Sequence, residues 1–303
     1  MKTASSKHGN GLRSSGSPRR RNNAWSSFLI TMRRAIKSPS AKIGTAIFII
    51  IVAACLAAPL IAPYGENDFD LGNTNAPPSL EHLCGTDSLG RDIFSRLLYG
   101  GRYSLAMGLC AAFVSNFLGV VIGISAGYFG GHVENTIMRV MDVWSSLPGI
   151  LLCIIISTVL GGGFVNTVIA LGISSVPNGV RMNRGQVLAE RSKEYLEAAE
   201  SINCSKASIM FRHLLPNVIS PTIVAMTMGL GGTISQAASL SFIGLGIQPP
   251  TAEWGAMLSA GRNYIFTYPH LITFPGITIA IAVLSVNLMG DGLRDALDPK
   301  LKD

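Results

Sequence analysis

The stretch 194–217, EYLEAAESINCSKASIMFRHLLPN, is polar and charged, and it is flanked by two long segments, residues 143–180 and 218–252, that contain no Asp, Glu, Lys or Arg. Each flanking segment is long enough to cross a bilayer, for which an α-helix needs about 20 apolar residues. A charged stretch between two such segments has to lie in water. We therefore interpret residues 194–217, called the 194–217 loop below, as an aqueous loop of a membrane protein.

The composition of the whole chain favours the same interpretation. Of its 303 residues, 48% are hydrophobic and only 14% are charged, which is typical of a membrane protein. Charge-free segments favour helices, because backbone polar groups in lipid need partners within their own segment. We predict an all-α membrane protein whose transmembrane domain covers residues 43–303. Six transmembrane helices are expected, at about residues 43–62, 103–129, 137–160, 164–180, 222–247 and 271–289.

The 194–217 loop is predicted to form a helix, a tight turn and a second helix. Residues 193–202 are rich in Glu, Ala and Leu, which favour a helix. Asn203 breaks this pattern, and after Gly it is Asn that most readily adopts the left-handed conformation of a sharp turn. Ser205 is expected to cap the second helix, which Pro216 is expected to interrupt.

Two small residues in the first helix of the loop, Ala198 and Ala199, would leave a flat surface against which another protein could pack. An ordinary cytoplasmic loop with a solvated helix fits the same pattern. Periodicity alone leaves both interpretations open, a docking site and a solvated connection.

The N-terminal tail, residues 1–42, predicts the orientation. Ten Lys or Arg residues precede the first acidic residue, Glu66, and basic residues beside a span mark the cytoplasmic side. With six spans, both termini are expected on the cytoplasmic side of the inner membrane. Residues 1–24 are expected to be largely disordered, and residues 25–37 have the spacing of an amphipathic helix on the membrane surface. No folded basic surface follows the tail, so we expect membrane lipid and not nucleic acid as its partner.

Two segments, residues 65–102 and 248–262, are then expected outside the cell membrane. In the first of them, Asp92 and Arg96 have the spacing of an ion pair within a short helix on the outer membrane surface. This helix is expected to be separate from the span that begins at residue 103. On the inner side, three charged residues are expected to pair with one another: Glu134, Arg139 and Asp142.

No pattern in the chain predicts catalysis, a cofactor or a metal site. There is no GxxxxGK[ST] motif that would hold ATP, and the five Cys and five His residues show no metal-ligand spacing. No ionisable relay crosses the membrane, which argues against a proton-driven transporter. Uncharged polar residues in or near the spans either line a pathway or bond between helices: Asn116, Asn166, Asn178, Gln236 and Asn287.

Several motifs resemble one known family. Glu197-Ala198-Ala199, the turn residue at position 203 and Leu215-Pro216 resemble the EAA loop of permease subunits of ATP-binding-cassette (ABC) importers, in which Gly usually stands at the position of Asn203. Four further stretches within residues 80–303 are similar to the C-type permease of the dipeptide, oligopeptide and nickel branch: GTDSLGRDIFSRLLYGGRYSL (85–105), AGYFGGHVENTIMRVMD (126–142), ASLSFIGLGIQPPTAEWGAML (238–258) and NLMGDGLRDALDPKLKD (287–303).

The resemblance implies a type I ABC importer permease fold, in which the 194–217 loop is a cytoplasmic coupling helix that docks on an ATPase subunit. The docking residues would be Glu197, Ala198, Ala199, Asn203, Leu215 and Pro216. It also implies that one or two separate subunits hydrolyse ATP, that a second permease completes the pathway and that an external binding protein delivers the cargo. Peptides, glutathione-like ones included, are the expected cargo. Nickel chelates or other small solutes are the alternative within the family, and a stand-alone transporter or channel is the alternative class.

Overall fold

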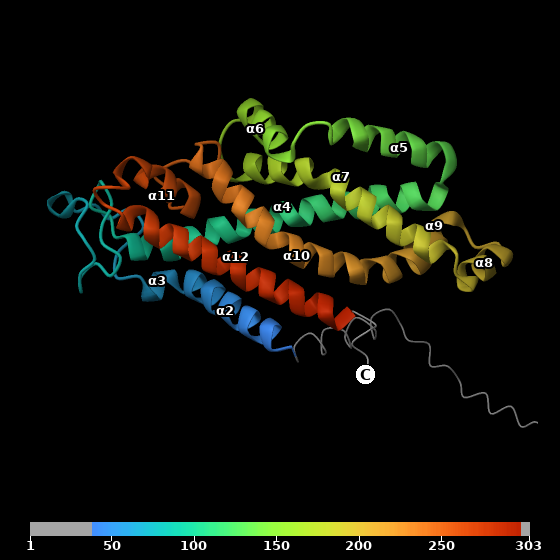
Figure 1. Ribbon diagram of the computed structural model, residues 1–303, viewed down its shortest axis with the longest axis horizontal. Helices are drawn as coiled ribbons and strands as arrows, with labels where there is room; N and C mark the ends of the chain where they lie inside the picture. Colours follow the sequence, from blue (N-terminus) through green and yellow to red (C-terminus); the bar gives the residue numbers. More distant parts are fainter. Residues whose placement is uncertain (1–37, 298–303) are drawn as a thin grey trace, which may run out of the picture.

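The protein is an all-helical bundle in the computed structural model, which describes residues 38–297 (Figure 1). Every regular element in this part of the chain is a helix, which confirms the predicted fold class. The predictions for residues 1–24 and 25–37 fall outside the described residues.

The elements follow one another in a simple order. They are α2 (Pro39–Leu56), α3 (Ala58–Ile61), the 3₁₀ turn η1 (Leu71–Asn73), α4 (Ile93–Phe129), α5 (Gly131–Trp144), α6 (Gly149–Leu160), α7 (Phe164–Arg191), α8 (Glu194–Ser201), α9 (Lys206–Ser208), the π-helical turn η2 (Ile209–Leu214), α10 (Leu215–Phe242), α11 (Trp254–Gly261), the 3₁₀ turn η3 (Arg262–Tyr264) and α12 (His270–Leu297).

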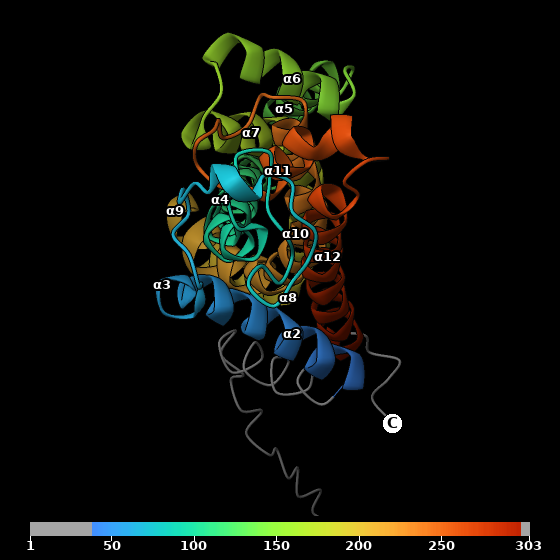
Figure 2. The same ribbon diagram turned by 90° about the vertical axis from the view of Figure 1, so that its left-hand side faces the viewer.

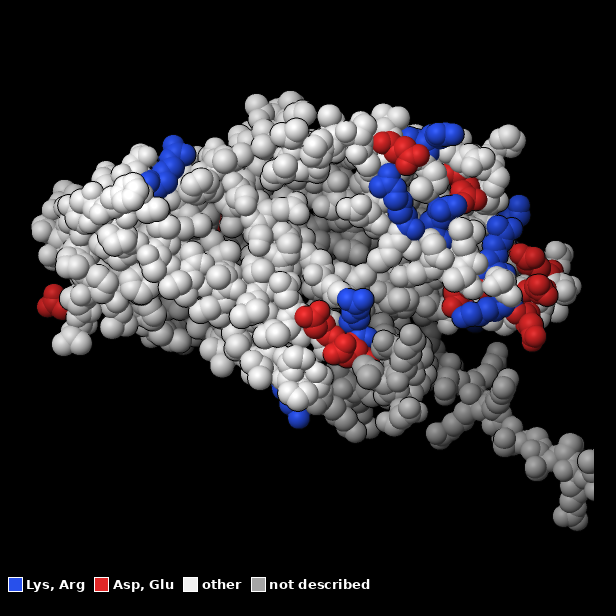
Figure 3. Space-filling model, viewed as in Figure 1, with Lys and Arg blue, Asp and Glu red and all other residues white. Residues whose placement is uncertain are grey.

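The long helices lie along the long axis of the molecule, with α4 and α10 between α2 on one side and α5 and α6 on the other (Figures 1 and 2). One end of the bundle carries α11 and the other carries α8. Figure 3 shows most charged side chains near the α8 end, with a broad uncharged band between them and the α11 end. Such a band is what a surface in contact with lipid needs.

Four or five segments of the described chain meet the length and composition of a membrane span. By length and composition, four of the described helices can cross a membrane: Pro39–Leu56, Ile93–Phe129, Lys206–Phe242 and His270–Ala296. The α5–α6 pair, bent by 80°, adds a fifth if it counts as one span. The helix α7 runs beside α4 but is too polar to meet the same criterion, because its second half carries charged residues. The expected count of six is therefore not confirmed.

The predicted outer-surface helix is in fact the first part of α4, which continues without a break to Phe129. Asp92 caps this helix by accepting a hydrogen bond from the Ser95 N–H (2.7 Å), and its other carboxylate oxygen lies 3.0 Å from Nδ1 of His82. Arg96 instead pairs with Asp87. The expected Asp92–Arg96 ion pair is therefore wrong, because a capping carboxylate points toward the helix end and away from the next turn.

Close glycine contacts fix α4 against α7. Gly119, Gly123 and Gly127 lie on one face of α4, and they approach Gly179, Asn183 and Val187 of α7. A Cβ atom at Gly119 would lie 2.8 Å from the Cα of Gly179, which is closer than real Cβ contacts come. This spacing of small residues every fourth position lets two helix backbones approach closely in a membrane. It holds α7 on the bundle although α7 is the least apolar of the long helices.

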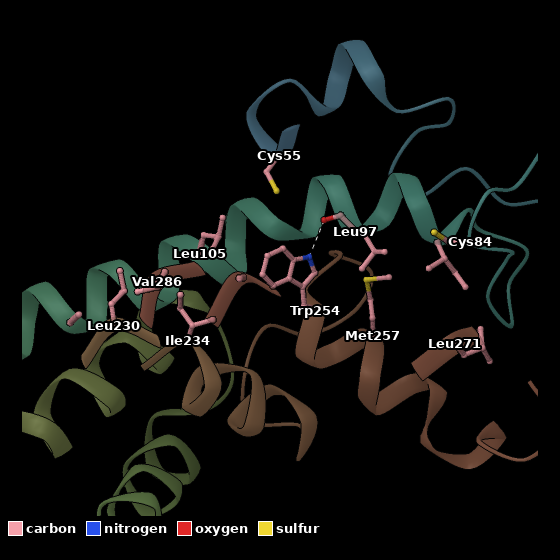
Figure 4. Close-up of a cluster of buried hydrophobic side chains, with 13 residues drawn as sticks. Cys55, Cys84, Leu97, Leu105, Leu230, Ile234, Trp254, Met257, Leu271 and Val286 are labelled. Atoms are coloured by element: carbon pink, nitrogen blue, oxygen red, sulfur yellow. Dashed lines mark hydrogen bonds between the residues drawn. The ribbon is translucent and has the colours of Figure 1, made fainter. Parts of the chain in front are cut away.

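A core that begins at the α11 end joins α2, α4, α10, α11 and α12 (Figure 4). Trp254 is fully buried there, and its indole N–H donates to the Leu97 carbonyl (2.9 Å). The neighbouring Glu253 is also fully buried, caps α11 through the Ala256 N–H and accepts a hydrogen bond from Ser104 (2.7 Å). A buried polar side chain is stable only when it is hydrogen-bonded in this way, so both packing and polar contacts stabilise this end of the bundle.

Candidate functional site

The 194–217 loop forms a compact cap on one end of the bundle, with α8, α9 and η2 in sequence (Figure 1). The predicted turn is confirmed: Asn203 has φ of 58°, in the left-handed region. The Asn203 and Cys204 N–H groups donate to the carbonyls of Glu200 and Ala199, which closes the end of α8. The predicted cap is confirmed as well, because the Ser205 hydroxyl accepts a hydrogen bond from the Ser208 N–H (3.3 Å).

The predicted interruption at Pro216 is wrong. The π-helical turn η2 leads directly into α10, so that one helix runs from Lys206 to Phe242. Proline lacks an N–H and its ring clashes with the carbonyl four residues earlier in an α-helix. The wider π-helical turn just before Pro216 gives that ring room, and its missing N–H falls in the first turn of α10. Leu215 and Pro216 are therefore half-buried parts of α10.

The two alanines of α8 face different ways. Ala199 is only 5% exposed and packs with Leu196 against residues of this same chain, among them Ile124, Val187 and Val218. Ala198 is exposed. Adjacent residues of an α-helix are about 100° apart, so they cannot both lie on one narrow surface. The expectation that both alanines offer one flat docking surface is wrong.

The exposed face of α8 combines acidic, small and apolar groups. Glu197, Ala198 and Asn203 are exposed there, and Ile202 is 77% exposed. Phe211, on η2 in the same loop, is 66% exposed. Sequence reasoning missed Ile202 and Phe211, although a large apolar residue in an otherwise polar stretch is a signal that could have identified them.

The two carboxylates of α5 pair with arginines of α7 and not with Arg139 of their own helix. Glu134 pairs with Arg184, and Asp142 lies 3.0 Å from Arg181. The expected pairing among Glu134, Arg139 and Asp142 is therefore wrong, since α5 lies beside α7 and the arginines of α7 reach the α5 carboxylates. These ion pairs attach α5 near the α8 end.

A polar cavity of about 260 Å³ lies between α4, α7 and α10. The space-filling view shows the surface hollowed between α7 and α10 (Figure 3). The lining of the cavity has small and uncharged polar groups, and no Asp, Glu, Lys or Arg of the described residues contributes to it. The polar lining residues are Ser115, Asn116, Ser175, Asn178, Thr233 and Gln236.

Three of the five predicted pathway residues thus meet at this cavity, Asn116, Asn178 and Gln236. The other two lie elsewhere. Asn166 donates to the carbonyls of Leu160 (2.8 Å) and Gly161 and so closes the end of α6. Asn287 packs against Gly231, between α10 and α12. The serines and threonine of the cavity were not predicted, because small hydroxyl residues are common in membrane helices for helix–helix packing alone.

No group of three His, Cys, Asp or Glu residues within residues 38–297 is placed to hold a metal ion. The arrangement offers hydrogen-bonding groups in a cavity and a protruding loop at one end. Both features suit passage and contact with another protein.

Comparison with known proteins identifies the family. Residues 119–303 match the family model described as binding-protein-dependent transport system inner membrane component, and residues 26–78 match the N-terminal transmembrane domain of oligopeptide transport permease C. The chain is 46% identical over 280 residues to the glutathione transport system permease protein GsiD of Escherichia coli O6:K15:H31, covering 92% of this chain and 91% of that protein. The same identity and coverage apply to GsiD of Shigella boydii serotype 4.

Among solved structures, the inward-facing MetNI methionine ABC transporter is similar at 21% sequence identity, with a TM-score of 0.49 and coverage of 67% of this chain and 97% of that chain. The family assignment rests on the sequence comparisons, which cover most of the chain. ABC importer permeases are transport components and not enzymes. This chain belongs to the binding-protein-dependent inner membrane components, as a multi-pass permease subunit of an ABC importer of the oligopeptide family.

Proposed function

We propose that this chain is one of two permease subunits of an ATP-driven importer of small peptides, with glutathione-like peptides as the cargo. The observation that carries the proposal is the 46% identity, over 92% of the chain, to proteins named as glutathione transport permeases. An identity this high over nearly the full length supports a related cargo. ATP would be hydrolysed by separate subunits, and an external binding protein would deliver the peptide.

The polar cavity supports a peptide as cargo. A peptide carries amide N–H and C=O groups that need partners once they leave water. The side-chain amides of Asn178 and Gln236 carry both donors and an acceptor, and the hydroxyls beside them do the same. Asn116 adds its amide oxygen as an acceptor, while its N–H₂ group donates one bond to the Ala112 carbonyl of its own helix (2.8 Å). A lining without fixed charge would let peptides with different side chains pass, because it neither repels nor traps either sign.

The 194–217 loop is proposed as the contact with an ATPase subunit. Its exposed Glu197, Ala198, Ile202 and Asn203 would form the docking face, while the buried Leu196 and Ala199 anchor α8 to this chain. An exposed Ile beside small and charged residues is the composition of an interface core with a polar rim. Because an ATPase subunit would lie in the cytoplasm, this docking would put the α8 end, and both termini, on the cytoplasmic side of the membrane.

The proposal is tested by transport in proteoliposomes. The chain is reconstituted into vesicles with its second permease and ATPase subunits, and binding protein loaded with labelled glutathione is added outside. We expect glutathione to accumulate inside the vesicles only when ATP is enclosed there. A histidine chelate of nickel, offered in the same vesicles, tests the alternative cargo. Accumulation by this chain without ATPase subunits would contradict the proposal and favour a stand-alone transporter.

A further inference from the structure

The helices that enter and leave the 194–217 loop, α7 and α10, are joined by a buried polar contact. The Thr222 hydroxyl of α10 lies 2.6 Å from Oδ1 of Asn183 of α7. Asn183 is 0% exposed and Thr222 is 3% exposed. The Asn183 amide N–H₂ group donates to the Gly179 carbonyl of its own helix (2.8 Å), which leaves Oδ1 as an acceptor. The single hydrogen of the Thr222 hydroxyl can also reach the Val218 carbonyl of its own helix (2.8 Å) and Gln186 Oε1 (3.3 Å), but Asn183 Oδ1 is its nearest acceptor, so this hydroxyl supplies the donor for that oxygen. Without it, a buried acceptor would lack a partner.

A second polar contact joins the same helices at the edge of the loop. The Tyr195 hydroxyl, on α8, donates to the Glu190 carboxylate (2.8 Å) and accepts from the Asn217 side chain (3.1 Å). Glu190 belongs to α7 and Asn217 to α10. Burial, followed by the hydrogen bond to Glu190, raises the pKa of Tyr195 above its usual range, so the hydroxyl stays protonated as the donor in this bridge.

Apolar side chains fill the space between the two polar contacts. Val187 of α7 and Val218 of α10 are fully buried and pack in one cluster with Leu196 and Ala199 of α8. A close-packed core resists local deformation and transmits displacement. A tilt of α8 would therefore have to carry the adjoining ends of α7 and α10 with it.

We propose that Asn183, Thr222 and Tyr195 are positioning residues that clamp α7 and α10 together, so that a displacement of the 194–217 loop reaches the polar cavity as a rigid movement of both helices. The inference rests on the proposed docking of this loop on an ATPase subunit. It goes further by naming the residues that link the loop to the cavity walls, which α7 and α10 supply through Asn178, Thr233 and Gln236. None of the three clamp residues needs to touch the cargo.

The test measures peptides transported per ATP hydrolysed by the whole reconstituted complex. Thr222→Val keeps the shape of the side chain but removes the hydroxyl, and we expect transport per ATP to fall by roughly tenfold, the effect of leaving one buried acceptor unpaired. ATP hydrolysis and complex assembly are expected to persist. Thr222→Ser keeps the hydroxyl and is expected to restore the ratio. A merely structural role would lower the amount of complex and leave this ratio unchanged.

Thr227→Val is the matched control. The Thr227 hydroxyl bonds the Ile223 carbonyl of its own helix (3.0 Å), as the Thr222 hydroxyl can bond Val218, but within residues 38–297 it bonds no group of α7. It is expected to transport like the unmodified complex. Normal transport per ATP in an assembled Thr222→Val complex would overturn the clamp. If that variant fails to assemble, Tyr195→Phe is measured in its place. A loss of transport per ATP smaller than tenfold supports the clamp, and an unchanged transport per ATP overturns it. An unmodified complex without ATP-driven peptide transport would instead contradict the proposed function, and the clamp with it.

Discussion

Asn203 holds the one sharp turn of the 194–217 loop with a φ of 58°. In this region a β-branched residue is strongly disfavoured, whereas Gly enters it without strain. We expect Asn203→Gly to keep both pull-down of the ATPase subunit and peptide uptake. Asn203→Val is expected to weaken both, because it opposes the turn that closes α8. Equal behaviour of the two variants would show that the turn conformation has no role in docking.

The neighbouring alanines allow docking and folding to be separated. Ala198 is exposed, so Ala198→Arg is expected to leave the folded permease pair intact while it reduces ATPase pull-down and uptake severalfold. Ala199 is buried, so Ala199→Arg would place an unpaired charge in the core and lower the amount of folded chain itself.

The control for this prediction is Ala189→Arg, at an exposed position of α7 outside α8. It is expected to behave like the unmodified chain in both pull-down and uptake. Normal ATPase binding by Ala198→Arg would place the docking surface elsewhere on the protein.

At the scale of elements, the contact between α4 and α7 depends on residues without side chains. Gly119→Ala would force a methyl group against the α7 backbone, and overpacking of this kind costs about 1–3 kcal/mol. We therefore expect a lower unfolding temperature of the purified chain in detergent. Gly232→Ala is the matched change on α10, where a Cβ meets nothing within 4 Å. It is expected to be neutral or slightly stabilising, since Ala favours helix over Gly. Equal effects would show that the close approach does not limit stability.

At the scale of the whole molecule, the orientation in the membrane is tested with cysteines. Cys204 lies half-buried in the 194–217 loop, whereas Leu80, in the segment between α3 and α4, is 98% exposed at the other end. A membrane-impermeant maleimide added to intact cells is expected to label Leu80→Cys. Cys204 is expected to react only after the membrane is permeabilised, so that the reagent reaches the cytoplasmic side. The reverse pattern would invert the proposed topology.

The native Cys84 is an internal control for this labelling. Burial, with a contribution from Asp92, raises the pKa of the Cys84 thiol to about 11, so almost none of it is thiolate at pH 7.5. Because the thiolate is the reactive form, Cys84 is expected to stay unlabelled until the protein is unfolded, even though it lies near Leu80.

The sequence by itself determined the all-helical class, the family and the helix–turn–helix form of the 194–217 loop. Charge-free runs, a left-handed Asn203 and a capping Ser205 are local properties of the chain, and local physics decides them. It also singled out Asn116, Asn178 and Gln236, which line the polar cavity, because uncharged polar side chains in apolar segments are unusual enough to be noticed.

Only the tertiary structure decided which surfaces face outward and which residues pair. Ala198 and Ala199 look alike in sequence, yet the packing of α8 on α7 and α10 buries one and exposes the other. Glu134 pairs with Arg184, 50 residues away, and Thr222 bonds Asn183 across two helices. Such contacts depend on how helices distant in sequence pack together. The order of residues along one segment does not show which other segment it packs against.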